Sequence, residues 1–151
     1  MVNPELIDKL NDILRWEWTG VAQYSQYSFV LTGIWREVFS GRFAESASES
    51  FGHAKKIGEK ISALGGVPAV ERDPVKQTGS LQAMLENSLC FEQTAVQLYQ
   101  EALELADGVD RPLVVLLEEI LLEEQEGVDE FTLILRDHES GEMADAITNV
   151  G

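Results

Sequence analysis

Apolar side chains recur three and four positions apart along most of the chain, which is the spacing of one buried helix face. The first series consists of Leu6, Leu10, Ile13, Val21, Tyr24, Leu31 and Trp35. The second consists of Phe43, Ala47, Ala54, Ile57, Ile61 and Leu64. The third consists of Leu81, Leu85, Ser88, Val96, Tyr99 and Ala106, and the fourth of Leu113, Leu117, Ile120, Val128, Phe131 and Leu135. The pattern predicts four amphipathic helices that share one core.

Proline and glycine mark where these helices begin and end. Residues 3–5, Asn-Pro-Glu, combine a capping residue, a proline in the first turn and an acid near the positive end of the helix dipole. Residues 110–112, Asp-Arg-Pro, repeat this start signal before the fourth series. Gly65 and Gly66 end the second series, and Gly108 follows the third.

The longest connection is predicted between the second and third helices. Residues 65–79 contain glycine, two prolines and mixed charge, so we expect them to lack regular structure. A link of about fifteen residues is too long for a tight turn but could run the length of a bundle. The expected fold is therefore an all-α, antiparallel four-helix bundle with a long crossover between helices 2 and 3. Residues 1–151 are expected to form a single domain, with a short C-terminal helix after Gly141.

Three glutamates interrupt the apolar series. Glu17 falls on the buried face of the first helix, Glu92 on that of the third and Glu124 on that of the fourth. His53 lies near the inward face of the second helix. An unpaired buried carboxylate costs several kcal/mol even after relaxation, so three of them on core faces require a compensating group. A metal cation held by these four side chains is the simplest interpretation.

These side chains are also expected to lie at a common depth in the bundle. Two residues of an antiparallel hairpin face each other when the turn is midway between them. The midpoint of the glutamates on the third and fourth helices is Gly108. The midpoint of Glu17 and His53 is position 35, close to Gly33. If Gly41 were the first turn instead, the latter pair would lie several residues apart in height.

Charge and composition narrow the class of partner. The net charge is −16 and no cluster of lysine and arginine is present, which argues against binding nucleic acid. Cations are more natural partners, although excess carboxylate can also serve solubility alone. No apolar run approaches the ~20 residues that span a bilayer, and the N-terminus does not read as a secretory signal. The single cysteine, Cys90, cannot form an internal disulfide and is expected to pack in the protein. These features are typical of a cytoplasmic protein.

Three segments resemble bacterioferritins, within the wider ferritin-like superfamily. They are Leu10 to Tyr24, His53 to Pro68, and Glu124 to Asp129. In that family the first and third helices each give one glutamate to a metal centre, and the second and fourth each give a Glu-x-x-His pair. The resemblance therefore assigns four of six ligand places to Glu17, His53, Glu92 and Glu124. The two other places hold Ser50 and Gly127.

The resemblance implies a site that binds two irons, oxidises Fe(II) and supports iron storage in a hollow cage. Loss of a carboxylate at Ser50 and of an imidazole at Gly127 makes the site atypical. Glu49, four residues before His53, could replace the missing carboxylate after a modest helix rotation. On the fourth helix Glu123, Glu126 and Glu130 are near the missing imidazole, but we expect them to face water.

Two aromatic residues also bear on the site. Tyr24 matches a tyrosine near the family's metal centre, and either a redox or hydrogen-bonding role or ordinary core packing would explain it. Phe51 stands where the resemblance places a haem-ligating methionine, so we expect no haem in the usual position, because phenylalanine has no lone pair for iron.

The first functional hypothesis is an iron-binding, bacterioferritin-like protein that stores or weakly oxidises iron, as a ferroxidase, at an atypical mononuclear or dinuclear site. Manganese and zinc suit the same ligands. The alternatives are a structural subunit of a cage or dimer that has lost catalysis, and a diiron-type oxidase acting on an organic substrate. We expect a homo-oligomer, or a hetero-oligomer with a complete ferritin, and neither nucleic acid nor a membrane as partner.

Overall fold

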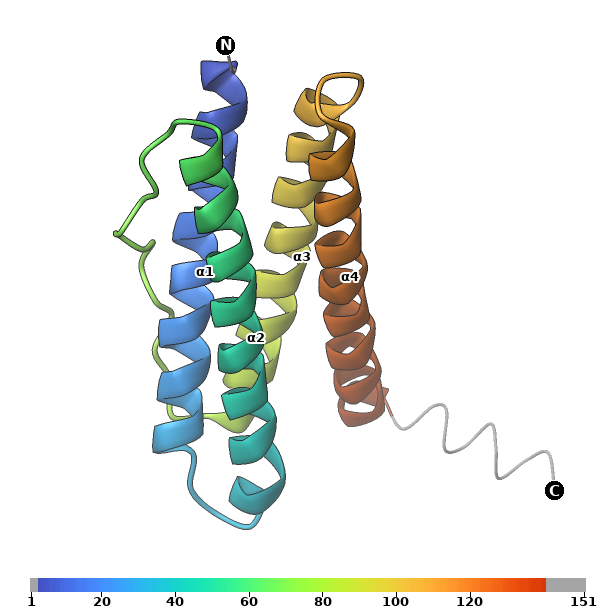
Figure 1. Cartoon of the computed structure of the whole chain (residues 1–151). Helices are drawn as coiled ribbons and strands as arrows, with labels where there is room; N and C mark the ends of the chain where they lie inside the picture. The colour runs from blue at the N-terminus through green and yellow to red at the C-terminus, as the bar shows by residue number, and fades with distance from the viewer. Residues whose placement is uncertain (1–2, 141–151) are drawn as a thin grey trace, which may run out of the picture.

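The computed structural model describes residues 3–140, and side chains are described as far as residue 136. This part of the chain contains four long helices (Figure 1). They are α1 (Pro4–Val30), α2 (Arg36–Ala63), α3 (Leu81–Ala106) and α4 (Arg111–Ser140). The structure confirms the all-α four-helix bundle and the long crossover. The predicted helix after Gly141 lies outside the described residues.

Both hairpins turn at a glycine whose backbone lies in the left-handed region. Gly33, with φ of 96°, lies in the turn between α1 and α2, and Gly108, with φ of 74°, lies between α3 and α4. Glycine adopts this conformation without the steric cost of a Cβ. Gly41 instead lies inside α2, so the predicted facing of Glu17 and His53 rests on the correct turn.

The placement of Trp35 on the inward face of the first helix was wrong. The chain leaves α1 at Val30, and Trp35 precedes the first residue of α2 with 55% of its surface exposed. Leu31, at the end of α1, remains buried. The apolar spacing that included Trp35 therefore extended past the end of α1 into the turn, where it no longer indicates one helix face.

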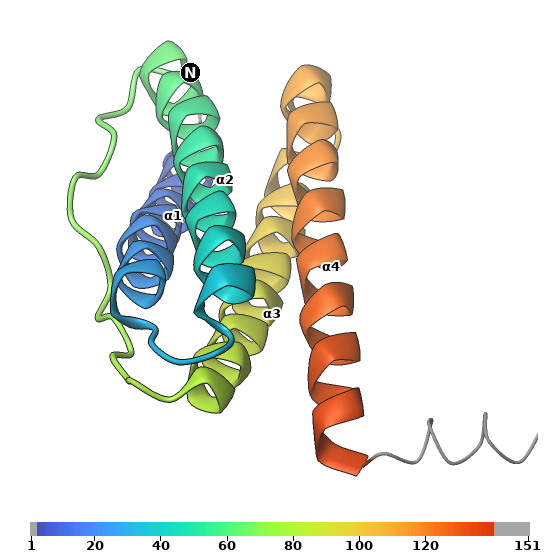
Figure 2. The same cartoon turned by 90° about the horizontal axis from the view of Figure 1, so that it is seen from below.

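The crossover between α2 and α3 runs along α1 in an extended conformation (Figures 1 and 2). Its backbone is hydrogen-bonded by side chains from one face of α1, namely Asn11, Trp18, Thr19, Gln23 and Tyr27. The Ala69 N–H donates to Asn11 Oδ1 at 2.8 Å, and the Lys76 N–H donates to Gln23 Oε1 at 2.9 Å. The buried polar residues Thr19 and Gln23 thus serve the link.

The core has an aliphatic half and an aromatic half. The aliphatic half surrounds the first turns of α1, with Leu6, Leu10, Ile57 and Ile61 fully buried. The aromatic half lies toward the α1–α2 turn and consists mainly of Tyr24, Tyr27, Phe43, Phe91 and Phe131. Along each helix, the buried glutamates and His53 fall between the two halves.

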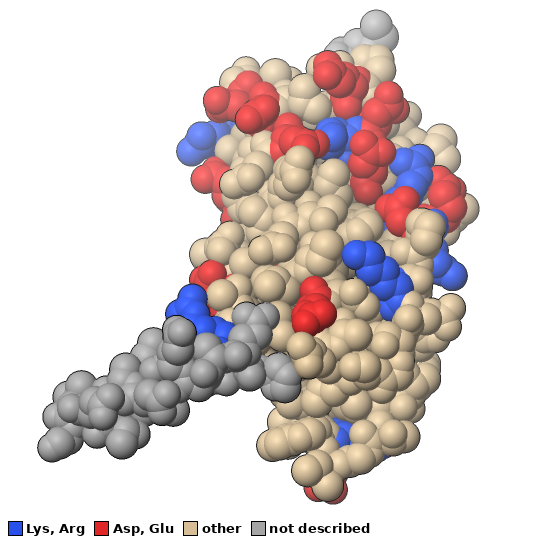
Figure 3. Space-filling view, turned by 180° about the vertical axis from the view of Figure 1, so that it is seen from behind, with Lys and Arg blue, Asp and Glu red and all other residues tan. Residues whose placement is uncertain are grey.

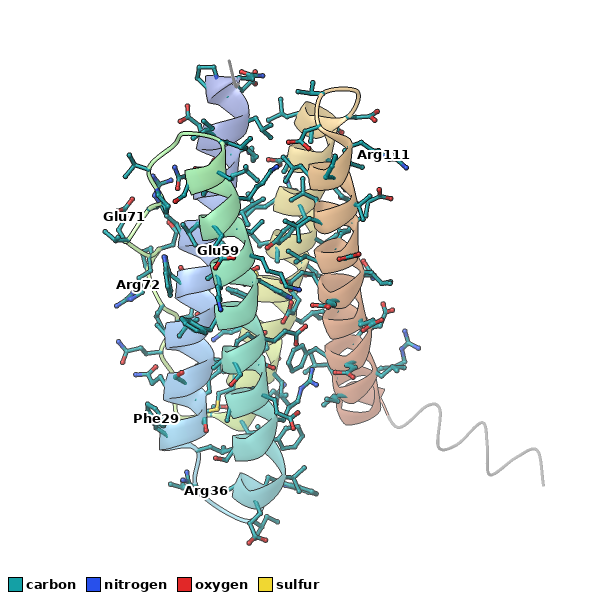
Figure 4. All side chains as sticks on the ribbon, viewed as in Figure 1. Phe29, Arg36, Glu59, Glu71, Arg72 and Arg111 are labelled. Atoms are coloured by element: carbon teal, nitrogen blue, oxygen red, sulfur yellow. The ribbon has the colours of Figure 1, made fainter. Side chains whose placement is uncertain are left out.

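The surface is also divided along the bundle. On the face shown in Figure 3, charged side chains gather toward the end where α1 begins, and the opposite end is mostly uncharged. That opposite end carries exposed apolar side chains around the α1–α2 turn, among them Phe29, which points outward in Figure 4, Ile34 and Val38. None of the described helices is long and apolar enough to cross a membrane. Cys90 is exposed, so its predicted packing was wrong.

Candidate metal centre

Each of the four helices contributes one buried ionisable side chain to the middle of the bundle. Glu17, His53, Glu92 and Glu124 are 0%, 3%, 8% and 4% exposed. The structure brings Glu17, His53 and Glu124 together, with one donor atom of each lying within 4.8 Å of the others. His53 Nδ1 lies 2.9 Å from Glu124 Oε1 and 3.5 Å from Glu17 Oε1. One imidazole and two carboxylates from three helices thus converge on one point.

The other ring nitrogen of His53 faces a second pair of carboxylates. His53 Nε2 lies 2.6 Å from Glu123 Oε2 and 4.0 Å from Glu49 Oε1. The Glu49 and Glu123 side chains are 51% and 46% exposed. The proposed substitute ligand Glu49 is therefore on the solvent side of the imidazole, outside the buried group. Glu123, which we expected only to face water, is half exposed and contacts His53.

Two buried tyrosines donate hydrogen bonds to the buried glutamates. The Tyr99 hydroxyl donates to Glu17 Oε1 at 2.9 Å, and the Tyr24 hydroxyl donates to Glu92 Oε1 at 2.7 Å. Burial, together with these neighbouring carboxylates, raises the pKa of both phenols well above its usual value. The sequence analysis assigned Tyr99 only to the apolar series, although it lies seven residues after Glu92 and so on the same face of α3 as that glutamate.

Glu92 is the fourth of these side chains and is not one of the three whose donor atoms converge. It lies beside Glu124 and Tyr24 and against Gly127 of α4. A Cβ at Gly127 would lie 3.0 Å from Glu92 Cδ and 3.2 Å from Glu92 Oε2. The Glu92 carboxyl thus packs directly against the position where the family pattern has a histidine.

Ser50 occupies the other departure from the family pattern. It is buried at 5% exposure and packs against Gly20 of α1. A Cβ at Gly20 would lie 2.4 Å from Ser50 Oγ and 2.6 Å from Phe91 Cζ. The absence of a side chain at Gly20 is what allows α1, Ser50 and Phe91 to meet, and no anionic ligand comes from this position.

Glu17, His53, Glu92 and Glu124 form a buried polar layer in the middle of the bundle. Without a metal ion, bound protons neutralise the charge of this layer. Burial lowers the pKa of His53, but hydrogen bonds with Glu124 and Glu17 outweigh it and raise the pKa to about 11. Burial and the Glu17 charge raise the pKa of Glu124 to about 7. Burial and the adjacent Glu124 raise the pKa of Glu92 well above its usual value. A protonated imidazolium therefore compensates the carboxylates around it at neutral pH.

The residues of the buried group fit a divalent cation. Glu17 Oε2 is buried and has no hydrogen-bond partner among the described residues, so this carboxylate has an unused acceptor. A cation would satisfy that oxygen and replace the proton of His53, because metal ligands bind in their deprotonated forms. Imidazole and carboxylate ligands suit iron, manganese or zinc. Phe51, at the position of the family's haem ligand, is 52% exposed on α2 and has no donor atom.

Comparisons with known proteins agree with this geometry. The chain is 31% identical over 129 residues to a bacterioferritin of Rhodobacter capsulatus, covering 84% of this chain and 80% of the relative. It is 28% identical over 144 residues to a nutrient stress-induced DNA-binding protein of Nostoc sp. strain PCC 7120, covering 82% of this chain and 78% of the relative.

Solved structures of ferritin-like proteins superpose on this chain. A ferritin-like, diiron-carboxylate protein of Bacillus anthracis superposes with a TM-score of 0.84 at 32% identity, covering 87% of this chain and 95% of the other. A dodecameric thioferritin of Bacteroides fragilis superposes with a TM-score of 0.82 at 28% identity, covering 94% and 89%. The ferritin-like domain family matches residues 7–140. The chain therefore belongs to the ferritin-like family.

Proposed function

We propose that the protein binds iron inside its helix bundle and takes part in iron storage or Fe(II) oxidation at an atypical site. The observation that carries the proposal is the convergence of Glu17, His53 and Glu124, together with a buried Glu17 oxygen, Oε2, that has no hydrogen-bond partner among the described residues. Buried charges in proteins are usually paired or coordinate metals. Membership of the ferritin-like family and the likeness to a diiron-carboxylate protein support iron as the metal.

The chain's own residues have distinct tasks in this proposal. Glu17, His53 and Glu124 hold the ion, and Tyr99 orients Glu17 by its hydrogen bond. Glu49 and Glu123 lie between the imidazole and solvent, where their charge would attract cations. Iron, when bound, supplies one-electron redox chemistry. Tyr24, hydrogen-bonded to Glu92, could exchange a proton or an electron with the site.

The proposal is tested by measuring iron per chain. Protein stripped with a chelator would be loaded anaerobically with Fe(II), desalted and analysed for iron by mass spectrometry, with molar mass taken from the same sample by light scattering. We expect iron to remain bound to the wild-type chain and to be lost from Glu17→Gln. On exposure to air, oxidation of the bound Fe(II) would be followed by its absorbance. A wild-type chain that retains no iron would remove the proposal.

A structural subunit without catalysis is the second candidate, and one observation favours it. His53 lies 3.5 Å from Glu17 and 2.9 Å from Glu124, so its imidazolium can compensate these buried carboxylates without an ion. This candidate predicts that the metal-free chain assembles fully and that added iron changes neither its mass nor its thermal midpoint. The first candidate predicts that bound iron raises the midpoint, because binding to the folded state alone stabilises it.

We also propose that the chain is a cytoplasmic homo-oligomer that binds neither nucleic acid nor a membrane, with association with a complete ferritin as the alternative. The similar thioferritin is dodecameric. The exposed apolar side chains around the α1–α2 turn, including Phe29 and Ile34, suit contacts between subunits. Light scattering of the purified chain distinguishes a cage from a dimer.

A further inference from the structure

We infer that the bundle holds one divalent cation per chain, on Glu17, His53 and Glu124, with Glu123 as the residue that orients His53, and that Glu92 is not a ligand. This inference rests on the proposed metal-binding function and specifies it. It concerns the number of ions and the identity of their ligands, both of which differ from the two-ion, six-ligand pattern of the family.

The first metal position has a full set of protein donors. Three ligands and an open position are the usual composition of a reactive metal site in proteins. Glu17, His53 and Glu124 come from three different helices, and all three are buried. Two of them are held by a neighbour outside the group, since Tyr99 donates to Glu17 and Glu123 lies 2.6 Å from His53 Nε2.

The second metal position lacks donors and is filled by the protein itself. The two side chains that would complete it are replaced by Ser50, which packs against Gly20, and by Gly127, which has none. Glu92 closes the remaining space, because its carboxyl carbon lies only 3.0 Å from where a Cβ at Gly127 would be. Glu92 Oε1 also accepts a hydrogen bond from the Tyr24 hydroxyl at 2.7 Å, although its buried Oε2, like that of Glu17, has no hydrogen-bond partner among the described residues. The second metal position is then left with two donor side chains, those of Glu92 and Glu124.

The outer group of Glu49, His53 and Glu123 does not provide a second ion site at the same time. A neutral imidazole has one nitrogen lone pair, so His53 can bind an ion through Nδ1 or through Nε2, but not through both. The inner carboxylates are buried and gain most from a cation, whereas Glu49 and Glu123 are about half exposed to water.

Glu123 then acts as a positioning residue. When Nδ1 binds the ion, Nε2 carries the ring proton, and this N–H donates a hydrogen bond to Glu123 Oε2, which lies 2.6 Å away. A carboxylate in this position fixes both the tautomer and the orientation of a metal-binding histidine, and losing such a partner typically costs 10–100-fold in metal affinity. Glu126, on the exposed side of the same helix, offers a matched control because it belongs to neither group of metal-binding side chains.

The test is an anaerobic titration of the metal-stripped full chain with Co(II), followed by calorimetry and by the visible absorbance of the bound ion. The wild-type chain should bind one Co(II). Glu92→Gln should bind one Co(II) with affinity changed by less than about 3-fold, and Glu17→Gln should lose more than about 100-fold. Glu123→Ala should bind one Co(II) about 10–100-fold more weakly, and Glu126→Ala should match the wild type.

Each result separates this inference from the function on which it rests. Two Co(II) per wild-type chain, reduced to one by Glu92→Gln, would overturn the single-ion inference and leave metal binding intact. No Co(II) and no iron on the wild-type chain would overturn metal binding itself. Equal losses in Glu123→Ala and Glu126→Ala would overturn the positioning role. If Glu92→Gln does not fold, Tyr24→Phe, which releases Glu92 from its partner, replaces it with the same expectation.

Discussion

The buried polar layer has two sides, one built around His53 and the other around Glu92. On the His53 side, carboxylates from two helices face a cationic imidazolium at 2.9 and 3.5 Å. On the Glu92 side, a carboxyl faces a phenol and a second carboxylate, with a glycine where a ligand would stand. Both sides hold buried glutamate at similar depth, yet in the single-ion arrangement that we propose the first side holds a cation and the second a proton. The neighbours of a glutamate, more than its burial, decide which it holds.

The largest expected effect on stability comes from removing the His53 imidazolium. His53→Ala leaves Glu17 and Glu124 buried without their partner, and breaking a buried ion pair in this way costs about 3–5 kcal/mol. Glu92→Gln, which keeps the shape and removes a buried carboxyl, should leave the free energy of unfolding equal or slightly higher. Urea denaturation of the metal-free variants at pH 7 measures both values. Similar losses in the two variants would mean that the sides do not differ as described.

The pH dependence of stability should come from the same groups. Glu124 and Glu92 have raised pKa values in the folded chain, and that of His53 rises from 6.5 to about 11. The folded chain therefore binds more protons than the unfolded chain above pH ~4.5, and its stability should fall as the pH rises. The slope is at most about 1.4 kcal/mol per pH unit for each proton.

The His53 side contributes over a defined pH range. The contribution of His53 is complete below pH 6.5 and is lost as the pH approaches 11. His53→Ala should therefore flatten the stability curve above pH 7. Unfolding of the metal-free proteins between pH 5 and 10 checks this expectation. A wild-type stability that rises through this range would contradict the protonation states assigned here.

Packing at Ser50 should also be sensitive to a single methyl group. Gly20→Ala would place a Cβ 2.4 Å from Ser50 Oγ and 2.6 Å from Phe91 Cζ, so α1 or Phe91 must shift. Overpacking costs about 1–3 kcal/mol, against which alanine regains up to about 1 kcal/mol of helix propensity. We expect a net loss of about 1–2 kcal/mol in thermal or urea unfolding, partly recovered in the double variant with Ser50→Gly. A stabilised Gly20→Ala would show that this contact is loose.

The two tyrosines allow a matched comparison of metal affinity. Tyr99→Phe removes the hydrogen bond to Glu17, a ligand in our proposal, and should weaken Co(II) binding about 10-fold, the lower end of the effect of losing an outer partner. Tyr24→Phe removes the corresponding bond to Glu92 and should leave the affinity unchanged. Calorimetry of Co(II) binding to both variants measures these affinities. A larger loss of affinity in Tyr24→Phe than in Tyr99→Phe would assign the ion to the Glu92 side.

The smallest effect is expected outside the layer. Lys60 of α2 lies 3.1 Å from Asp110 Oδ2, just before α4, in a partly exposed ion pair. Such pairs contribute about 0–1 kcal/mol and are screened by salt. Lys60→Ala should therefore change the free energy of unfolding by less than about 1 kcal/mol and should leave metal affinity unaltered. A larger loss would show that this ion pair contributes more to stability than partly exposed pairs usually do.

The sequence predicted the parts of this structure that depend on periodicity. Apolar spacing defined four helices, and the buried glutamates stood out because each broke an apolar series. Gly33 and Gly108 gave the correct turns, which brought Glu17 and His53 to the same level. These features are local along the chain, so a single sequence contains enough information to define them.

Features that depend on how the helices pack against one another, and on where each helix ends, were not predicted. Glu123 belongs to a run of acids that looks like a solvated face, and only the position of α2 shows that its carboxylate meets His53. Trp35 continued an apolar spacing beyond the end of its helix, and Cys90 lay between apolar neighbours but on the exposed side. The contact of the Glu92 carboxyl with Gly127 also joins two helices, and it depends on the missing side chain at Gly127.

The crossover along α1 has a consequence for how this chain can vary in length. Surface connections usually accept insertions, because their backbone is hydrogen-bonded to water. Here the N–H groups of Ala69, Asp73 and Lys76 donate to side chains spaced along one face of α1. One added residue between them would move every later donor out of register with its acceptor. The spacing of polar residues on α1 thus sets the length of a segment that has no secondary structure of its own.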